Sequence, residues 1–486
     1  MGNITIKEYE DIISLEKSAI IMGNGFSINF DWSFANIYDG LFDAHKLLLK
    51  KGRFRMKAAN PTYEKKGLQG YQNVLAALKN LKEDELNEVF KDGVVFLESL
   101  CKDSLLLTKI NNTNYFSTLT HRKAHTDVLL DMMSAYRTNN NYKSISIEDW
   151  TLLVGAYFSI NELKAEGELN GYDLPLDNRF LNLVEVGNIS TIRVSNSHYD
   201  NIVLNGFVSY LRMIFSIRIF NNGKAVDIQK LERLNEIDTE KLTEHLNQFT
   251  AHMTLNYDLI LEQLLNKKIP HIHGEFKLNH TEYLMCQSLT MNYNKSNVSF
   301  SDLLIGDDVT FKMALPMLQQ MALGSPNNRP KITTTTILQN EIIDLDITTV
   351  VIFGMGIAND HHILRFLMLA FHQNKNDARI IYSYFNEAEK ENFISEYEKV
   401  IKYSEDINQF IRSRIKVDFV KTQDILAEYF HLYTNAYSHI IVILIKLSYR
   451  GVRLWLKKVL FFLLICKVSM LRLRKLRTRP MKVNHL

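Results

Sequence analysis

Residues 249–275 restrict the fold more than any other stretch, because they read as strand, helix and strand in succession. Residues 249–254 have the aromatic and β-branched content of a short buried strand. Residues 259–265 carry apolar side chains at the spacing of one helix face, and 269–272 form a second short strand. Strands that alternate with helices predict a parallel sheet covered by helices.

Three polar residues follow the ends of these strands. Asn256 and Asp258 come after the first strand, and His273 follows the second, next to Gly274. In an open α/β sheet, ligands bind outside the carboxyl ends of the strands. Each residue also has an ordinary explanation: Asn256 is a common turn residue, Asp258 can cap the next helix, and a lone histidine is usually structural.

A glycine turn follows another compact apolar run. Residues 18–22 (SAIIM) predict a buried strand, and the chain continues as Gly23, Asn24, Gly25, Phe26 and Ser27. Two glycines separated by one residue let the backbone turn tightly and approach a ligand closely. A helix that begins near Ser27 would point its free N–H groups at a phosphate, although Gly-x-Gly also occurs in plain turns.

The alternation of strands and helices resumes towards the C-terminus. Strands are expected over 348–353, 379–384 and 416–420, and helices over 361–371 and 422–430. This pattern predicts an α/β fold with a parallel sheet and helices on both faces.

The segment between the glycine turn and Asn256 is expected to be mainly helical, over about residues 38–248. Residues 84–101 and 122–136 have apolar residues at helical spacing, and 203–220 are apolar on most sides, as in a buried helix. We interpret this segment as a helical insertion in one α/β domain of residues 1–435. It either covers the crevice at the strand ends or serves only as packing.

Charge is distributed unevenly along the chain. Of 57 Lys and Arg residues, 12 lie in residues 436–486, which contain no Asp or Glu. The remaining body has 45 basic and 54 acidic residues, a net charge of −9. An acidic body argues against nucleic-acid binding over its whole surface.

Residues 436–486 form a basic and apolar C-terminal tail. Lys446, Arg450, Arg453 and Lys457 would make one basic stripe on a helix, which suits a membrane surface or an acidic partner. The apolar runs of the tail are too short to span a bilayer. An altered reading frame or an engineered end would equally explain the abrupt change in composition.

Cysteine usage predicts a reducing, cytoplasmic location. Cys101, Cys286 and Cys466 are too scattered for a disulfide framework or a four-cysteine zinc site. His271 and His273 form an H-x-H pair, but no third ligand stands at a recognisable spacing. We therefore expect no metal.

Four motifs, in this order, resemble those of the sirtuin-like NAD-binding family. They are GNGFS at 23–27, TLNYD at 254–258, His273-Gly274, and GMG at 354–356. The family has a Gly-Ala-Gly or similar turn, a Thr-x-Asn-(Ile or Tyr)-Asp stretch, a His-Gly pair and a Gly-x-Ser or similar turn. The match covers roughly residues 18–430 and implies a Rossmann-like sheet that binds NAD.

Among sirtuin-like proteins, the bacterial ones are most similar, including a family with the Gly-Asn-Gly-Phe-Ser turn and abortive-infection proteins with a related turn. In such relatives the domain commonly hydrolyses NAD when a phage is sensed. The resemblance therefore implies an NAD glycohydrolase of antiphage defence that releases nicotinamide and ADP-ribose. It also implies a phage or host protein as trigger and leaves homo-oligomerisation open.

The chain departs from the family in two ways. It lacks the four-cysteine zinc module that supports the acyl-lysine cleft of protein deacylases, and Gly356 replaces the usual serine of the last turn. The missing module favours glycohydrolysis, with water as the acceptor, over protein deacylation.

Catalytic roles are expected for residues of the second and third motifs. Asn256 can hold a ribose hydroxyl and a water, because an amide both donates and accepts hydrogen bonds. His273 can act as a general base near neutral pH, and Asp258 can orient the ribose.

The glycine turns are the expected binding residues. Residues 23–27 would hold NAD, Gly354 and Gly356 would meet its phosphates or adenosine, and Asn386, beyond the strand 379–384, would meet the adenosine ribose. An alternative hypothesis is a sensor that binds NAD or ADP-ribose without cleaving it. The presence of both Asn256 and His273 favours the enzyme.

Overall fold

The computed structural model describes residues 1–50, 54–57, 61–116, 126–188, 201–202, 204–278, 288–293, 296–300, 338, 341–357, 360–374, 377–401, 409 and 412–431. The chain forms two compact units, Met1–Phe430 and His431–Leu486. The predictions for the tail at 436–486 lie outside the described residues, as do Cys286 and Cys466. Among the described helices, none is both long and apolar enough to cross a membrane.

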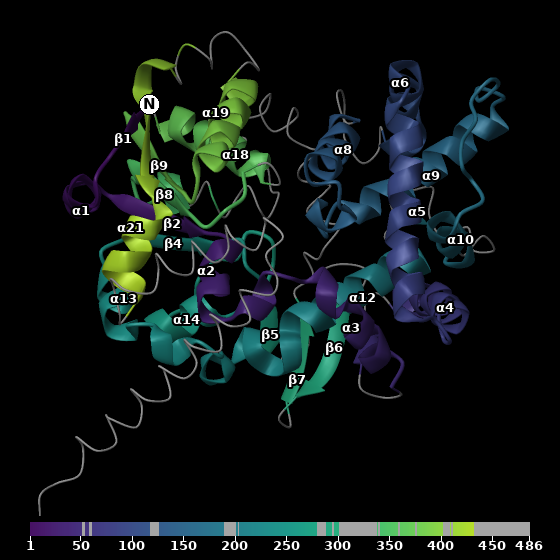
Figure 1. The fold of residues 1–486 in the computed structure, drawn as a ribbon, viewed down its shortest axis with the longest axis horizontal. Coiled ribbons are helices and arrows are strands. Elements are labelled where there is room, and N and C mark those ends of the chain that lie inside the picture. The colour runs from purple at the N-terminus through teal and green to yellow at the C-terminus, as the bar shows by residue number, and fades with distance from the viewer. Residues whose placement is uncertain are drawn as a thin grey trace, which may run out of the picture. The chain divides into compact units, whose positions relative to one another are not determined.

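A six-stranded parallel sheet forms the centre of the first unit, which confirms the α/β class (Figure 1). Its order is β1 (Gly2–Asn3), β10 (Ile415–Lys421), β9 (Ala378–Tyr384), β8 (Thr349–Phe353), β2 (Ser18–Met22) and β4 (Ala251–Thr254). All pairs are parallel. The expected strand at 269–272 is reduced to an isolated parallel bridge between Thr254 and His271.

Strand β2 explains why the sheet is covered on both faces. All five of its residues are buried, as expected for a central parallel strand. Ile20 and Met22 belong to one hydrophobic cluster, whereas Ala19 and Ile21 belong to another, because successive side chains point to opposite faces.

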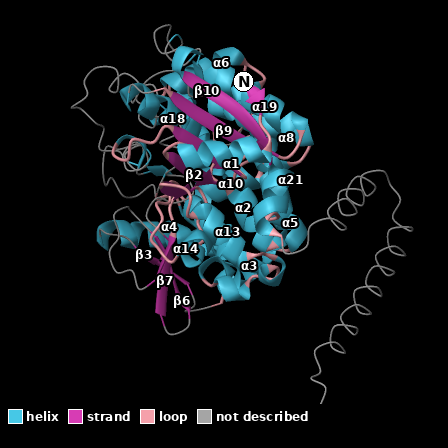
Figure 2. Ribbon diagram, turned by 90° about the vertical axis from the view of Figure 1, so that its left-hand side faces the viewer, coloured by secondary structure: helices cyan, strands magenta, loops and turns pink. Residues whose placement is uncertain are grey.

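Helices form the layers on the two faces (Figure 2). The first cluster includes side chains of α1 (Ile6–Leu15), α2 (Asn24–Phe30), α13 (Thr239–Leu246) and α21 (Thr422–Ile425). The second includes side chains of α18 (His361–Asn374) and α19 (Glu387–Ile401). The helix expected over 422–430 changes after Ile425 into a π-helical turn, Leu426–Phe430.

The segment between α2 and β4 is mainly helical. The α-helices in its described residues are α3 (Leu41–Leu48), α4 (Pro61–Ala77), α5 (Glu83–Cys101), α6 (Ser104–Asn112), α8 (Asp127–Asn139), α9 (Trp150–Ala165), α10 (Arg179–Val186), α12 (Gly206–Phe220) and α13. Helix α12 is buried along nearly its whole length, as its apolar sequence predicts.

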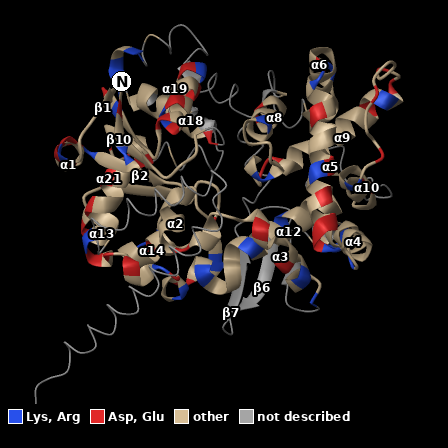
Figure 3. Cartoon of the chain, viewed as in Figure 1, with Lys and Arg blue, Asp and Glu red and all other residues tan. Residues whose placement is uncertain are grey.

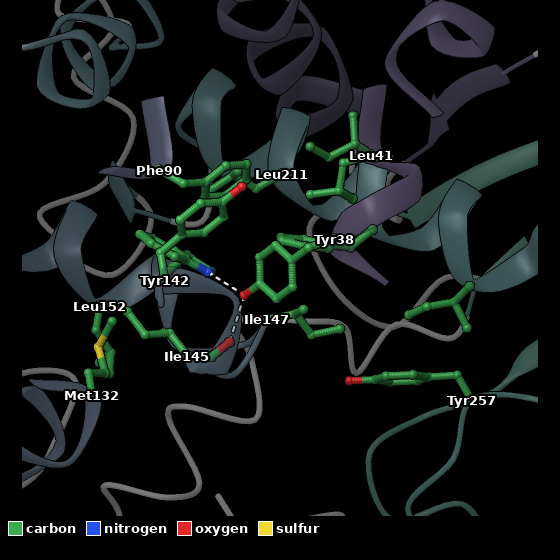
Figure 4. Packing of buried hydrophobic residues seen from close by; sticks show 14 of the residues in the cluster. Tyr38, Leu41, Phe90, Met132, Tyr142, Ile145, Ile147, Leu152, Leu211 and Tyr257 are labelled. Atoms are coloured by element: carbon green, nitrogen blue, oxygen red, sulfur yellow. Dashed lines mark hydrogen bonds between the residues drawn. The ribbon is translucent and has the colours of Figure 1, made fainter. Parts of the chain in front are cut away.

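Aromatic and aliphatic side chains pack together in the core of this helical segment (Figure 4). The Tyr38 hydroxyl donates to the Ile145 carbonyl at 2.6 Å and accepts from Trp150 Nε1 at 2.8 Å. Phe90 packs edge-on against both Tyr38 and Trp150. A buried hydroxyl satisfied in both directions fixes the segment to one packing arrangement.

A second, antiparallel sheet was not expected from the sequence. Its order is β3 (Phe54–Lys57), β6 (Ser288–Tyr293), β7 (Ser296–Phe300) and β5 (Phe276–Leu278). The stretch 279–297 is rich in asparagine, which hid the alternation of Leu289, Met291 and Tyr293 with polar residues. This period of two is the signal that predicts a strand.

Candidate functional site

Strand register brings three of the four motifs to one edge of the sheet. Met22, the last residue of β2, is paired with Thr254 on one side and Phe353 on the other. The three parallel strands therefore end at the same level, and the turns that follow them are neighbours.

The glycine turns after β2 and β8 contact each other through their backbones. Gly23 N–H donates to the Phe353 carbonyl at 2.9 Å, and Gly25 N–H donates to the Gly354 carbonyl at 2.8 Å. A Cβ atom at Gly23 would lie 2.6 Å from the Gly354 oxygen, and Gly354 has a φ of +66°. Close packing of the two turns thus already requires glycine at these three positions.

Gly356 is different from the other turn glycines. A Cβ atom there would meet no described atom within 4 Å, and its φ lies outside the left-handed region. Neither packing nor backbone conformation in the described structure therefore requires glycine at this position.

Helix α2 begins at Asn24, one turn earlier than expected, and contains no charged residue (Figure 3). Asn24 Nδ2 donates to the Phe34 carbonyl at 3.1 Å. The Phe26 ring is buried against Phe30 and Phe430. Asn24 and Phe26 therefore have structural roles of their own, and Ser27 lies within the helix instead of at its start.

Ser27 joins the two polar residues of the second motif. Its hydroxyl donates to Asp258 Oδ2 at 2.7 Å and accepts from Asn256 Nδ2 at 2.8 Å. All three side chains are buried. The structure thus brings Ser27 of the first motif together with Asn256 and Asp258 of the second.

Asn256 is held from several directions, but one of its polar atoms is left over. Its backbone N–H donates to Thr254 Oγ1 at 3.0 Å, and Nδ2 also donates to the Gly23 carbonyl at 3.0 Å. No hydrogen bond to a described residue uses Oδ1, although the residue is only 7% exposed. This fixed oxygen can accept a hydrogen bond from a ligand hydroxyl or a water.

Asp258 combines a capping role with a perturbed ionisation. Its Oδ1 accepts from Ile260 N–H at 3.2 Å, at the start of α14 (Ile260–Leu265). Burial raises the pKa of Asp258 to about 6, although the Ser27 hydrogen bond, Ile260 and the nearby His271 act in the opposite direction. The carboxylate is therefore costly to ionise in this position.

His273 is buried at the edge of the sheet and faces an acidic residue that sequence reasoning missed. Its Nε2 lies 3.9 Å from Asp360 Oδ1. Gly274 has a φ of +102°, which favours glycine directly after this histidine. Asp360 comes seven residues after β8, and its place beyond a strand end was the available signal.

A second histidine lies behind the Asn256 turn. The His271 side chain is buried, with Nδ1 at 2.6 Å from the Asn256 carbonyl and Nε2 at 2.5 Å from Glu262 Oε1. Glu275 Oε2 lies 4.0 Å from His271 Nε2. Together these three side chains satisfy the distances of a small metal site, but His271 Nε2 and Glu262 Oε1 already lie within hydrogen-bonding distance of each other, and the pair is an ion pair only when His271 is protonated.

Asn386 lies apart from this cluster, as far as the described contacts show. It caps α19, where its Oδ1 accepts from Glu389 N–H at 3.0 Å. No described hydrogen bond or ion pair connects it to the other motifs.

The helical segment reaches the site through Tyr257. The Tyr257 hydroxyl donates to Glu148 Oε1 at 2.7 Å, and both residues are buried. Figure 4 includes Tyr257 among the side chains of the large hydrophobic cluster. No sequence motif pointed to Glu148, because a single acidic residue in a helical region is usually exposed.

The site as a whole consists of a fixed amide, a buried histidine and a buried carboxylate at the carboxyl edge of a parallel sheet. This arrangement suits ligand binding combined with proton transfer. No protein-family model, curated protein or solved structure matches the chain.

Proposed function

We propose that the protein is an NAD glycohydrolase with a sirtuin-like, Rossmann-like fold. The observation that supports this most directly is Asn256, whose Oδ1 has no described partner while its other polar groups are fixed. A preorganised acceptor at the edge of a parallel sheet is suited to holding a ribose hydroxyl.

The strand order supports the Rossmann-like assignment. With the bridging segment at His271 included and the two-residue edge strand β1 beyond β10 set aside, the order is His271, β4, β2, β8, β9 and β10. Along the chain this corresponds to the order 3-2-1-4-5-6, which reverses between β2 and β8. The turns that carry Gly25 and Gly354 lie at this reversal, where doubly wound sheets bind their ligands.

The proposed reaction breaks the bond between nicotinamide and ribose. Nicotinamide leaves with the bonding electron pair, and the ribose C1′ develops cation-like character that water then satisfies. Asn256 Oδ1 would position the ribose hydroxyl or the water, and His273 would accept the proton that the water loses. The products are nicotinamide, ADP-ribose and one proton.

The binding roles proposed for the glycine turns differ in their support. Residues 23–27 and Gly354 lie at the reversal point, but close packing already accounts for their glycines. Gly356 has open space where a side chain would be and is the stronger candidate for a phosphate or adenosine contact. Asn386 is proposed for the adenosine ribose from its position alone.

The biological setting is proposed from the motif resemblance. We propose a cytoplasmic role in bacterial abortive infection, with a phage or host protein as trigger and with homo-oligomerisation open. The contact between Tyr257 and Glu148 gives the helical segment a direct connection to the site. Membrane or acidic-partner binding is proposed only for the tail at 436–486.

The test is NAD consumption by the wild type, Asn256→Ala and His273→Ala, followed by chromatography of nicotinamide and ADP-ribose. Circular dichroism and calorimetry with NAD check folding and binding. Cleavage by the wild type together with folded, inactive variants is expected. NAD that binds to the wild type but stays intact, with every trigger tried, would favour the sensor instead. Absence of binding would contradict the sirtuin-like assignment.

A further inference from the structure

We propose that His271, held as an imidazolium between the Asn256 carbonyl and Glu262, is a positioning residue for the hydrolysis of NAD. The inference rests on the proposed function, and it assigns a role to a buried histidine that the reaction itself does not use.

The two ring nitrogens of His271 both face hydrogen-bond acceptors. Nδ1 lies 2.6 Å from the Asn256 carbonyl, and Nε2 lies 2.5 Å from Glu262 Oε1. A neutral imidazole carries one N–H and would leave one of these contacts without a proton, whereas an imidazolium donates to both. Glu262 supplies the counter-charge.

The charged surroundings of His271 favour this protonated state. Glu262 faces the ring from α14, and Glu275 faces it from the residue before β5. Asp258, in the turn after β4, is a third nearby acidic group. Burial alone would lower the pKa of His271, but the hydrogen bond and charge of Glu262, with Glu275 and the Asn256 carbonyl, raise it overall.

The consequence for the site is that Asn256 is fixed on every side except one. Thr254, Gly23 and Ser27 hold its N–H and amide nitrogen, and His271 holds its carbonyl. Charge-assisted hydrogen bonds are stronger than neutral ones, so this carbonyl contact limits movement of the turn. The same segment carries His273, so His271 positions both catalytic candidates.

The first experiment tests the protonation of His271 without reference to NAD. In the full chain with ¹⁵N-labelled histidine, two-bond ¹H–¹⁵N spectra distinguish a doubly protonated ring from either neutral tautomer. We expect His271 to be an imidazolium at about pH 7.5, which is above the ordinary pKa of histidine. The His271 signal is identified as the one that changes position in the Glu262→Gln variant. His252 is the internal control, because burial lowers its pKa to about 4. A neutral His271 would overturn the proposal.

The second experiment separates positioning from folding. His271→Gln leaves the Glu262 carboxylate without its counter-charge, and Glu262 Oε2 already has no hydrogen-bond partner among the described residues. The double variant His271→Gln, Glu262→Gln is a neutral pair. We expect it to recover the melting temperature, while kcat for NAD stays about tenfold or more below the wild type and KM changes little.

The matched control is His252→Gln. His252 is a buried histidine near the start of β4, and its Nε2 lies 2.7 Å from the Leu246 carbonyl. The kcat of this variant is expected to stay near the wild-type value. Recovery of kcat in the double variant would mean that His271 is only structural, and activation by added Zn²⁺ or Mn²⁺ would mean a metal site; either result overturns the proposal. If the chain does not cleave NAD at all, the NMR result still decides the protonation state.

Discussion

The Ser27 hydroxyl lies 2.7 Å from Asp258 Oδ2 and joins α2 to the turn after β4 across 231 positions of sequence. The same hydroxyl accepts a hydrogen bond from Asn256 Nδ2. Ser27 therefore connects the first motif with both polar residues of the second. Ser27 lies inside α2, and its hydroxyl serves these two contacts and not a phosphate at the start of the helix.

Ser27→Ala should destabilise the protein and disturb the site. Asp258 would lose a buried donor, which costs about 1–3 kcal/mol at neutral pH. Because the Ser27 hydrogen bond lowers the pKa of Asp258, that pKa should rise further in the variant. The loss should be smaller near pH 5, where Asp258 is protonated more often, and melting curves at about pH 5 and 7.5 measure the difference.

The control is Ser18→Ala, at the other end of β2. Ser18 is equally buried, but among the described residues its hydroxyl makes only a 3.4 Å contact, with the Ile13 carbonyl. Its variant should show no pH-dependent loss. Equal losses in both variants at both pH values would contradict the assigned role of Ser27.

Gly23→Ala should destabilise the protein, whereas Gly356→Ala should not. A Cβ atom at Gly23 would lie 2.6 Å from the Gly354 oxygen, so overpacking should cost about 1–3 kcal/mol or prevent folding. Gly356→Ala should leave the melting temperature unchanged, because no described atom lies within 4 Å. If Gly356 contacts NAD, the same variant should raise the dissociation constant for NAD. An unchanged constant in calorimetry would remove Gly356 from the binding site.

Asp258→Asn should stabilise the protein at neutral pH. The pKa of Asp258 is raised by burial from 3.8 to about 6, so the native state binds a proton more readily than the unfolded chain. Ionisation of the wild type therefore costs stability as pH rises from about 4 to about 6, by at most about 3 kcal/mol. The melting temperature of the variant, relative to the wild type, should rise over this range.

A loss of rate that accompanies this gain would indicate a functional carboxylate. If Asp258 also orients the ribose, Asp258→Asn should be more stable and slower, the usual exchange between stability and activity at a site. A variant without any pH-dependent difference from the wild type would show that Asp258 ionises as freely as an exposed residue.

The sequence predicts the parallel strands well because each is a short apolar run bounded by turn residues. The expected 18–22 strand coincides with β2, and the strands at 348–353, 379–384 and 416–420 are displaced by at most a residue at each end. Strand 269–272 was overestimated. Its only described pairing is the bridge at His271, where backbone hydrogen bonds join Thr254 to Pro270 and Ile272, and the contact of the His271 ring with the Asn256 carbonyl adds to them.

Contacts within the site could be predicted only as far as the strand ends. That Asn256 and the glycine turns are neighbours follows from parallel register. The roles of Ser27 and Glu262 could not be predicted in this way. Ser27 acts through Asn256 and Glu262 acts through His271, and the spacing of residues along the chain does not reveal such contacts between different elements. The mutual packing of Gly23 and Gly354 was likewise hidden, since a glycine pattern looks the same whether it faces a ligand or another backbone.

Tyr257→Phe should reduce activity by weakening the contact between the helical segment and the site. The Tyr257 hydroxyl donates to the buried Glu148 carboxylate, so its removal should cost about 1–2 kcal/mol. Tyr257 stands between Asn256 and Asp258, and a small displacement of this turn should lower kcat/KM for NAD by about tenfold.

Tyr142→Phe is the matched control, because the Tyr142 hydroxyl bonds to Asn87 Oδ1 at 2.8 Å within the helical segment. Both variants remove one largely buried hydroxyl, so both melting temperatures should fall, that of Tyr257→Phe somewhat more because its acceptor is a carboxylate. Only Tyr257→Phe should change kcat/KM, because only Tyr257 belongs to the turn after β4 that carries Asn256 and Asp258. Equal kinetic effects would mean that the helical segment acts through general stability. No effect of Tyr257→Phe would mean that the contact with Glu148 does not govern the geometry of Asn256.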